Sequence, residues 1–301
     1  MAQPAPPSLA RLLPFAAAAL GVGCLSLMDA FMKEAALVTG TYTATVLRSL
    51  MGAALIAPFW FWRKTAWPTR PVMKLHVERG IISAFMALSF FFALTKLPLA
   101  EAIAISFVAP LIALYLARVL LGEVIRPKAI FASLLGFAGT LVIVGGKIGG
   151  GDFDHDAALG LASLMFSALL YAYNFIVVRR QSQVAGPVEI ATFHSGIGGL
   201  VLLLFAPFVA TPPVSAALVP LACAAVLTVA GAMAIAWAYA RAEAQALVPI
   251  EYSGFLWASA LGWAFFDEAV TLPTLAGTIL IVSGCWLATR KGRKAPETAS
   301  A

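Results

Sequence analysis

The sequence contains few charged residues and very little cysteine. Only 11% of its 301 residues are Asp, Glu, Lys or Arg, and 61% are hydrophobic. A soluble domain carries about 25% charged residues, so the shortage excludes a water-soluble fold and a disordered chain. The three cysteines, Cys24, Cys223 and Cys285, are dispersed among apolar runs. This dispersal argues against a zinc site and against a disulfide framework.

Catalytic motifs are also absent. The chain contains no HExxH, no GxSxG, no Cys/His cluster and no Walker loop. We therefore expect a protein that is not an enzyme and that uses no cofactor or metal. The excess of 20 Lys and Arg over 14 Asp and Glu does not predict nucleic-acid binding. The basic residues fall in short segments between apolar runs, which is the signal for membrane orientation.

Long apolar runs dominate what remains. A membrane-spanning helix needs about 20 apolar residues, so this composition allows about eight to ten spans. The expected spans cover residues 12–32, 41–62, 79–97, 99–121, 127–146, 157–178, 188–209, 217–240, 246–266 and 272–289. Pro98 separates the third span from the fourth, because proline cannot continue a helix cleanly. The longest polar connections are expected at 63–79 and 147–156.

The basic residues segregate to one side of these spans. With the N-terminus in the cytoplasm, 16 Lys and Arg lie inside, and Lys33, Lys96 and Lys147 lie outside. Arg48 lies within a span. This asymmetry is a strong positive-inside signal and supports an even number of spans with both termini cytoplasmic.

The sequence repeats itself after a shift of 145 residues. Under this shift Lys96 falls on Arg241 and Glu123 falls on Glu268, and the apolar runs around them agree in length. Each copy holds about five expected spans, so the odd number inserts the second copy upside down. Inverted repeats are typical of secondary transporters, whose two similar halves exchange conformations.

An ordered set of short motifs runs through both copies. Its members are Ala93-Leu94, Leu99-Ala100-Glu101-Ala102, Pro110, Leu121-Gly122-Glu123, Gly136 and Gly139, then Asp267-Glu268, Gly277 and Gly284. With Arg48 in the second span, this set resembles the repeat of the EamA family in the drug/metabolite transporter superfamily. The resemblance covers residues 12–289. The second copy departs from the pattern, because it has Phe255 in place of Pro110 and its proline, Pro249, comes earlier.

The resemblance implies an all-α integral membrane protein with ten transmembrane helices in two inverted five-helix repeats. It divides the chain into a cytoplasmic tail (1–11), a first repeat (12–146), a periplasmic linker (147–156), a second repeat (157–289) and a basic cytoplasmic tail (290–301). It also implies a multi-pass protein of the inner membrane. The expected partners are the lipid bilayer and a small-molecule substrate, and a monomer and a homodimer both stay open.

Charged groups inside spans are candidates for function, because each costs about 2.5–3.5 kcal/mol at a span centre on insertion scales. Asp29 and Lys33 share a helix face, either as a cavity-facing pair or as an ion pair near the end of the span. Arg48 can hold a substrate carboxylate in a bidentate fork, or can tie helices together through Asp29. Glu251 can bind an ammonium group or take up a proton.

Other charged groups have structural interpretations beside the functional one. Glu101 opens a span, where a carboxylate favours the helix N-terminus. His194 can titrate near neutral pH or can be a satisfied buried histidine. Glu123 and Glu268 end their spans, and we assign them to structure or gating.

Aromatic and amide side chains complete the expected site. Most aromatic residues in spans belong to interface belts or to the core. Four polar or aromatic residues lie deep enough to line a cavity, namely Tyr171, Asn174, Tyr252 and Trp257. The expected substrate site therefore comprises Asp29, Arg48, Tyr171, Asn174, Glu251, Tyr252 and Trp257. Pro110 and Pro249 are the expected gating residues, because a proline breaks a helix where it can bend.

The resemblance implies a secondary transporter that moves small metabolites by alternating access, and amino-acid export is the interpretation we favour. A nucleobase, riboflavin or S-adenosylmethionine stays open as the substrate, as does uptake. A passive channel is the alternative from another class. It needs a continuous polar stripe, and the spans show none.

Overall fold

The computed structural model describes residues 9–62, 67–121, 127–149, 154–181, 183–239, 241, 250 and 252–289. Within these residues every regular element is a helix, as the composition predicts. The helices are α1 (Leu9–Thr39), α2 (Thr41–Trp62), α3 (Arg70–Leu94), α4 (Leu99–Ser106), α5 (Ala109–Leu121), α6 (Pro127–Gly149), α7 (His155–Gln181), α8 (Pro187–Val209), α9 (Ser215–Tyr239), α11 (Gly254–Phe266) and α12 (Leu272–Thr289).

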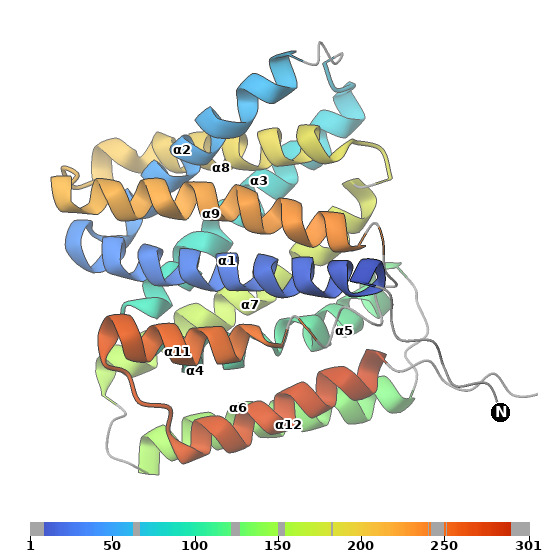
Figure 1. Cartoon of the computed structure of the whole chain (residues 1–301), viewed down its shortest axis with the longest axis vertical. Helices are drawn as coiled ribbons and strands as arrows, with labels where there is room; N and C mark the ends of the chain where they lie inside the picture. The colour runs from blue at the N-terminus through green and yellow to red at the C-terminus, as the bar shows by residue number, and fades with distance from the viewer. Residues whose placement is uncertain are drawn as a thin grey trace, which may run out of the picture.

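These helices lie side by side in a bundle, and their connections gather at its two ends (Figure 1). Six of them, α1, α2, α3, α7, α8 and α9, are long and apolar enough to cross a membrane. Shorter apolar segments occur at Leu99–Ala113, Leu134–Gly146, Gly254–Phe266 and Leu272–Gly284. The all-helical membrane fold is therefore confirmed, whereas the number of ten spans stays a prediction.

Several helices extend beyond the predicted spans. α3 begins at Arg70, with proline in its first turn, so the prediction of a connection over all of 63–79 was wrong. α6 continues to Gly149 and α7 begins at His155, so the linker expected at 147–156 is shorter. The physical reason is that charged residues at the ends of a membrane helix can stay helical while their side chains reach the interface.

The join between α3 and α4 follows the prediction. α3 ends at Leu94 and α4 begins at Leu99, with Pro98 as the residue before its first turn. Lys96 and Leu97 both donate backbone hydrogen bonds to the carbonyl of Ala93, which closes the end of α3. A short turn is therefore sufficient to connect α3 and α4.

The helices recur along the chain at the spacing of the sequence repeat. α3 and α9 begin at residues 70 and 215, α5 and α11 at 109 and 254, and α6 and α12 at 127 and 272. Each pair is 145 residues apart, which is the shift found in the sequence. The two halves therefore share the same order and starting points for these helices.

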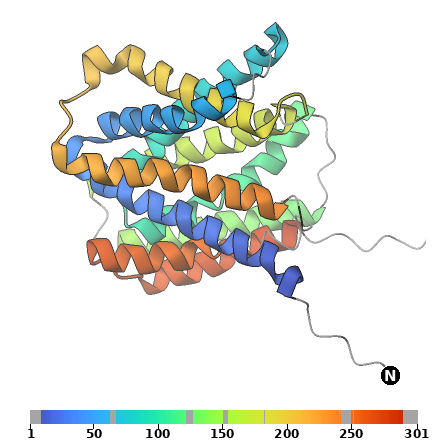
Figure 2. The same cartoon turned by 45° about the horizontal axis from the view of Figure 1, so that its top comes forward.

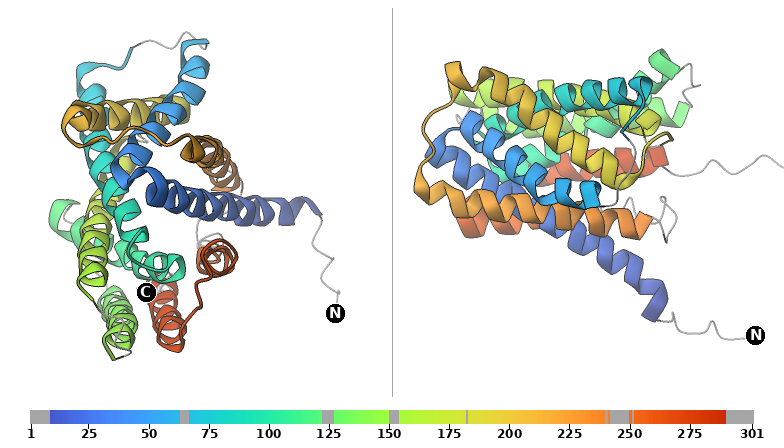
Figure 3. Two further views of the ribbon diagram at one scale, coloured as in Figure 1. Left: turned by 90° about the vertical axis from the view of Figure 1, so that its left-hand side faces the viewer. Right: turned by 90° about the horizontal axis from the view of Figure 1, so that it is seen from above.

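The core lies between the halves. α1 packs along α9, α3 along α7, α2 against α8 and α6 against α12. Each of these pairs takes one helix from each half, and Figure 2 shows α1 beside α9. The left view of Figure 3 shows α6 and α12 together at one edge of the bundle. The main apolar core accordingly joins residues of both halves, such as Met32, Leu94, Leu164 and Leu221.

Two glycines bring α6 and α12 into direct backbone contact. A Cβ atom on Gly139 would lie 2.5 Å from the carbonyl oxygen of Gly277, and a Cβ on Gly277 would lie 2.5 Å from the carbonyl oxygen of Gly139. Small residues allow membrane helices to approach this closely. Gly139 and Gly277, both members of the repeated motif set, therefore serve this contact.

Threonines tie the α1–α2 turn to the α8–α9 turn. The Thr43 hydroxyl lies 3.0 Å from the carbonyl oxygen of Thr211, whose own hydroxyl donates to the Thr39 carbonyl at 2.8 Å. The amide of Val214 donates to the Thr39 hydroxyl at 3.1 Å. These bonds join the two halves at one end of the bundle.

A buried polar chain joins α3, α7 and α8 toward the opposite end. His76 lies between Glu189, at 2.9 Å, and Gln181, at 2.6 Å. Arg79 donates to the Gln181 side-chain oxygen at 2.8 Å, and the Phe193 ring stacks on His76. Since His76 is fully buried, this chain fixes how the three helices pack.

Candidate substrate-binding site

The predicted break at Pro110 lies between α4 and α5. Proline lacks an amide hydrogen and cannot donate to the carbonyl of Ser106, so the helix is interrupted just before it. The amides of Phe107 and Val108 instead donate three residues back, to Ala104 at 3.2 Å and to Ile105 at 3.0 Å. The structure therefore confirms a break in this apolar segment, while its role in gating stays a prediction.

A second turn occupies the matching position in the other half. It lies at Tyr252 and Ser253, 145 residues beyond Phe107 and Val108, and α11 begins directly after it. The Ser253 amide donates to the Ile250 carbonyl at 2.9 Å. The rings of Phe107 and Tyr252 meet edge to face with their centroids 5.4 Å apart. The two turns thus contact each other inside the bundle.

The start of α11 packs against α1. A Cβ on Gly254 would lie 3.5 Å from Val22 and 4.0 Å from the Ser26 hydroxyl. The indole of Trp257 covers Gly23, since a Cβ there would lie 3.2 Å from the ring. Trp257 and the start of α11 therefore lie along α1 close to the face that carries Asp29, one turn beyond Ser26.

Arg48 links four helices at the centre of this region. Its guanidinium, on α2, lies 5.2 Å from the ring centroid of Phe91 on α3 and donates to the Thr228 hydroxyl on α9 at 3.5 Å. The carboxylate of Asp29, on α1, lies close enough to interact electrostatically with Arg48. The structure thus brings together Asp29 and Arg48, which the sequence singles out separately and as a possible pair.

Arg79 belongs to the same interior, and sequence reasoning missed it. We had placed Arg79 in a polar connection, yet it lies in the third turn of α3. Both Arg79 and Arg48 act electrostatically on His194 of α8. The signal that could have found Arg79 is Thr69-Arg70-Pro71, because proline is favoured in the first turn of a helix. Arg48, Arg79 and His194 are called the basic cluster below.

Asn174 and Tyr171 lie one turn apart on α7 and differ in burial. Asn174 is 8% exposed, and its side-chain oxygen has no hydrogen-bond partner within the described part of the chain. Tyr171 is 42% exposed and pairs edge to face with Phe175. These two rings share a helix face with buried Leu164 and Ala168. That face is therefore covered near the start of α7 and accessible near its end.

Lys33 and Glu268 form a buried ion pair between α1 and the turn after α11. Lys33 also donates to the Leu97 carbonyl at 2.9 Å, and the Leu99 amide donates to Glu268 at 2.7 Å. The sequence places Lys33 beside Asp29, and the structure shows that a carboxylate 235 residues away also reaches its ammonium group. These four residues are called the Lys33–Glu268 clamp below, and they confirm the structural assignment of Glu268.

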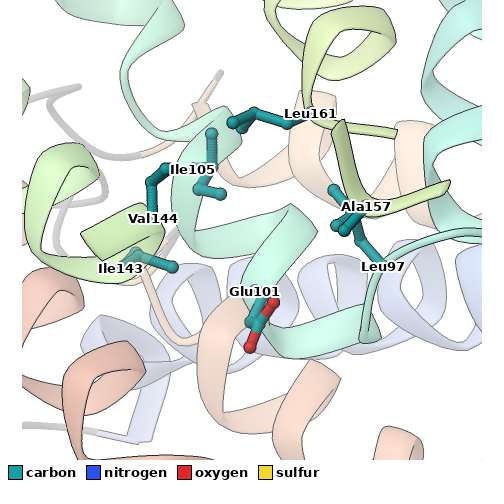
Figure 4. Close-up of a pocket in the computed structure, with 7 residues that line it drawn as sticks. All are labelled: Leu97, Glu101, Ile105, Ile143, Val144, Ala157 and Leu161. Carbon is teal, nitrogen blue, oxygen red and sulfur yellow. The ribbon is translucent and has the colours of Figure 1, made fainter. Parts of the chain in front are cut away.

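Glu101 lies in the first turn of α4 beside a small pocket. The residues that line this pocket are Leu97, Glu101, Ile105, Ile143, Val144, Ala157 and Leu161 (Figure 4). Glu101 is 7% exposed, and the Thr274 hydroxyl of α12 lies 3.4 Å from its carboxylate. Because the other lining residues are apolar, we do not assign a substrate to this pocket.

Some predicted residues lie outside the described part of the chain. They are Glu123, Pro249 and Glu251. Their contacts therefore play no part in the geometry above.

Comparison with known proteins agrees with this fold. The EamA-like transporter family matches residues 13–145 and 158–290. The pseudopaline exporter CntI of Pseudomonas aeruginosa is 27% identical over 263 residues, which cover 86% of this chain and 90% of the exporter. The aromatic amino acid exporter YddG of Ancylobacter novellus is 30% identical over 135 residues, which cover 43% of this chain and 46% of that protein.

A solved crystal structure shares the fold. It has 20% sequence identity and a TM-score of 0.61, over 91% of this chain and 96% of that chain. The family match extends over both halves and includes the motifs around Glu101, Pro110 and Glu268. The chain therefore belongs to the EamA-like transporter family of the drug/metabolite transporter superfamily.

Proposed function

We propose that the chain is a secondary transporter of the inner membrane that exports amino acids by alternating access. Its family supports the transport class, and the two relatives described above are exporters by name. The observation that carries the proposal is the contact of Phe107 with Tyr252. It joins two turns of the repeat inside the bundle, and the adjoining Gly254 packs against Ser26, one turn before Asp29 of the charged pair.

In this proposal the two repeats are inverted, and ten spans place both termini in the cytoplasm. The Lys33–Glu268 clamp and the threonine bonds of Thr39 and Thr211 then lie at the periplasmic end. Substrate can leave toward the periplasm only when these contacts separate. Pro110 and Pro249 are the proposed bending points, because neither can donate the hydrogen bond of a continuous helix.

The proposed substrate site joins the charged pair to aromatic walls. Arg48 would bind the carboxylate of an amino acid, and Asp29 or Glu251 would bind its ammonium group. Tyr252 and Trp257 would supply the apolar wall, together with Tyr171 and Asn174 from α7 of the same half. This arrangement follows the usual composition of small-molecule sites, in which a few polar groups orient a ligand against apolar side chains.

Counterflow in proteoliposomes tests the proposal. Vesicles that contain the purified full chain and an unlabelled compound would be diluted into medium with the same compound in radiolabelled form. We expect transient accumulation of one or more amino acids, and none with protein-free vesicles. Accumulation only of nucleobases, riboflavin or S-adenosylmethionine would replace the substrate class. A simple channel gives equilibration without accumulation, which would contradict the transporter mechanism.

A further inference from the structure

The basic cluster draws on three helices. Arg48 lies on α2 and Arg79 on α3, and both helices pack against α8, which carries His194. A Cβ on Gly52 of α2 would lie 3.7 Å from the Ser195 hydroxyl of α8. A Cβ on Gly80 of α3 would lie 2.5 Å from Ile197 of the same helix. Gly52 is one turn beyond Arg48, Gly80 directly follows Arg79, and His194 precedes Ser195. These close approaches bring α2 and α3 against the same stretch of α8, and Arg48 and Arg79 both lie near enough to His194 to act on it electrostatically.

Several polar atoms in this region are buried without a protein partner. Within the described part of the chain, Nε of Arg48 and Nε of Arg79 have no hydrogen-bond partner. The ring Nδ1 of His194 and the hydroxyl of Ser83, one turn beyond Arg79, also have no partner there. Buried polar groups are normally hydrogen-bonded, so these atoms point to a ligand with several acceptor oxygens.

The charge balance of the region is positive. Asp29 interacts with Arg48, but the other nearby carboxylates have different partners. Glu78 accepts a hydrogen bond from the Tyr173 hydroxyl at 2.6 Å, and Glu189 lies 2.9 Å from His76. Among the described residues, two guanidinium groups therefore face one carboxylate without another partner, that of Asp29, even when His194 is neutral. Burial of such an excess is costly unless an anion joins it.

We propose that the basic cluster is a carboxylate-binding site and that the chain selects substrates with a net negative charge. Within the proposed amino-acid export, on which this inference rests, the preferred substrates carry a second carboxylate beside the α-carboxylate. Arg48 would bind one carboxylate near Phe91 and Thr228. Arg79 and His194 would bind the other carboxylate. Asp29 remains near Arg48 to accept the ammonium group.

The test compares ligands that differ by one carboxylate. L-Glutamate and L-glutamine have nearly the same size, and glutarate keeps both carboxylates of glutamate without its amino group. Thermal stabilisation of the purified full chain in lipid nanodiscs would be titrated with each compound, and counterflow would be measured in parallel. We expect the midpoint for L-glutamate to be about tenfold lower than for L-glutamine, as one charge-assisted pair provides.

Variants separate the cluster from general surface charge. Arg79→Gln should abolish the preference for L-glutamate over L-glutamine, and Arg79→Lys should retain part of it. Lys74→Gln is the matched control, because Lys74 is exposed on the same helix. Comparison of the ligands on the unaltered chain keeps the test decisive if Arg79→Gln fails to fold.

The outcomes distinguish this inference from the proposed function. Equal midpoints for L-glutamate and L-glutamine, with amino acids exchanged in counterflow, overturn the inference and leave amino-acid export intact. If glutarate binds in an Arg79-dependent manner but no amino acid is exchanged, the carboxylate site stands and the proposed function falls.

Discussion

Phe107 and Tyr252 lie 145 residues apart in the chain, and their rings meet edge to face at 5.4 Å with an interplanar angle of 82°. Phe107 lies in the turn before α5 in one half, and Tyr252 lies in the turn before α11 in the other. Equivalent positions of two repeats can touch only close to the axis that relates them. In the proposed alternating-access cycle, this contact would mark the centre about which the halves exchange conformations.

Replacement of Pro110 by alanine should slow transport without unfolding the protein. Alanine restores the amide that can donate to the Ser106 carbonyl, so α4 and α5 can join into a stiffer helix. We expect counterflow of the transported substrate to slow by about three- to tenfold, because a conformational step limits turnover in many such cycles. The thermal midpoint should stay equal or rise. An unchanged rate would make the break a passive feature.

Replacement of Glu268 by glutamine should weaken the clamp. Glutamine can still accept the Leu99 amide, but the ion pair with buried Lys33 is lost. We expect a loss of about 2–3 kcal/mol in stability, measured as a lower thermal midpoint in detergent. Asp156→Asn is the control, because the Lys96–Asp156 pair is exposed and should contribute less than about 1 kcal/mol. Similar losses in both variants would argue against the clamp.

The glycine contact between α6 and α12 provides a second stability test. Gly139→Ala places a methyl group 2.5 Å from a backbone oxygen, so the helices must separate, and we expect a loss of about 2 kcal/mol. Gly145 lies in the same helix, and a Cβ there meets nothing within 4 Å. Gly145→Ala should therefore be neutral or stabilise by about 0.5 kcal/mol. Equal thermal midpoints for the two variants would contradict the close contact.

Glu251→Gln tests the acidic residue that the sequence singles out. It keeps the shape and hydrogen bonding of the side chain and removes the charge. If Glu251 binds the ammonium group, counterflow of amino acids should fall about tenfold or more at unchanged thermal midpoint. A lower midpoint with unchanged apparent affinity would instead assign Glu251 to helix packing.

The topology is open to a direct test by reporter fusions. The positive-inside signal places a fusion after Lys147 in the periplasm and a fusion after Arg290 in the cytoplasm. A periplasmic reporter should be active only at Lys147, and a cytoplasmic reporter only at Arg290. The reverse result at either position would remove the ten-span arrangement.

Local sequence patterns predicted the helices better than their contacts. The repeat spacing of 145 reappears in the starts of α3 and α9, because apolar length and Pro positions are encoded along the chain. The break at Pro110 follows from the missing amide alone. The turn at Tyr252 could not be inferred in this way, since Phe255 stands where the first half has proline.

Partners distant in the chain were beyond such reasoning. Lys33 has Asp29 within one helical turn, yet it pairs with Glu268, which only the folded bundle brings near. The charged residues around Arg79 predict a polar connection, although Arg79 lies in the third turn of α3 and reaches the interior. Local spacing finds which residues share a helix face, and it carries no information on which helix that face will meet.

The pairing of α1 with α9 and of α3 with α7 has a consequence for biosynthesis. When the ribosome has completed α6, the helices of the first half are already in the bilayer, but their main packing partners have not been made. These helices must wait in a loosely associated state until α7 and α9 insert. We therefore expect assembly to be completed late in translation, and a chain truncated after Gly149 to be degraded as an orphan rather than to persist as a half-sized protein.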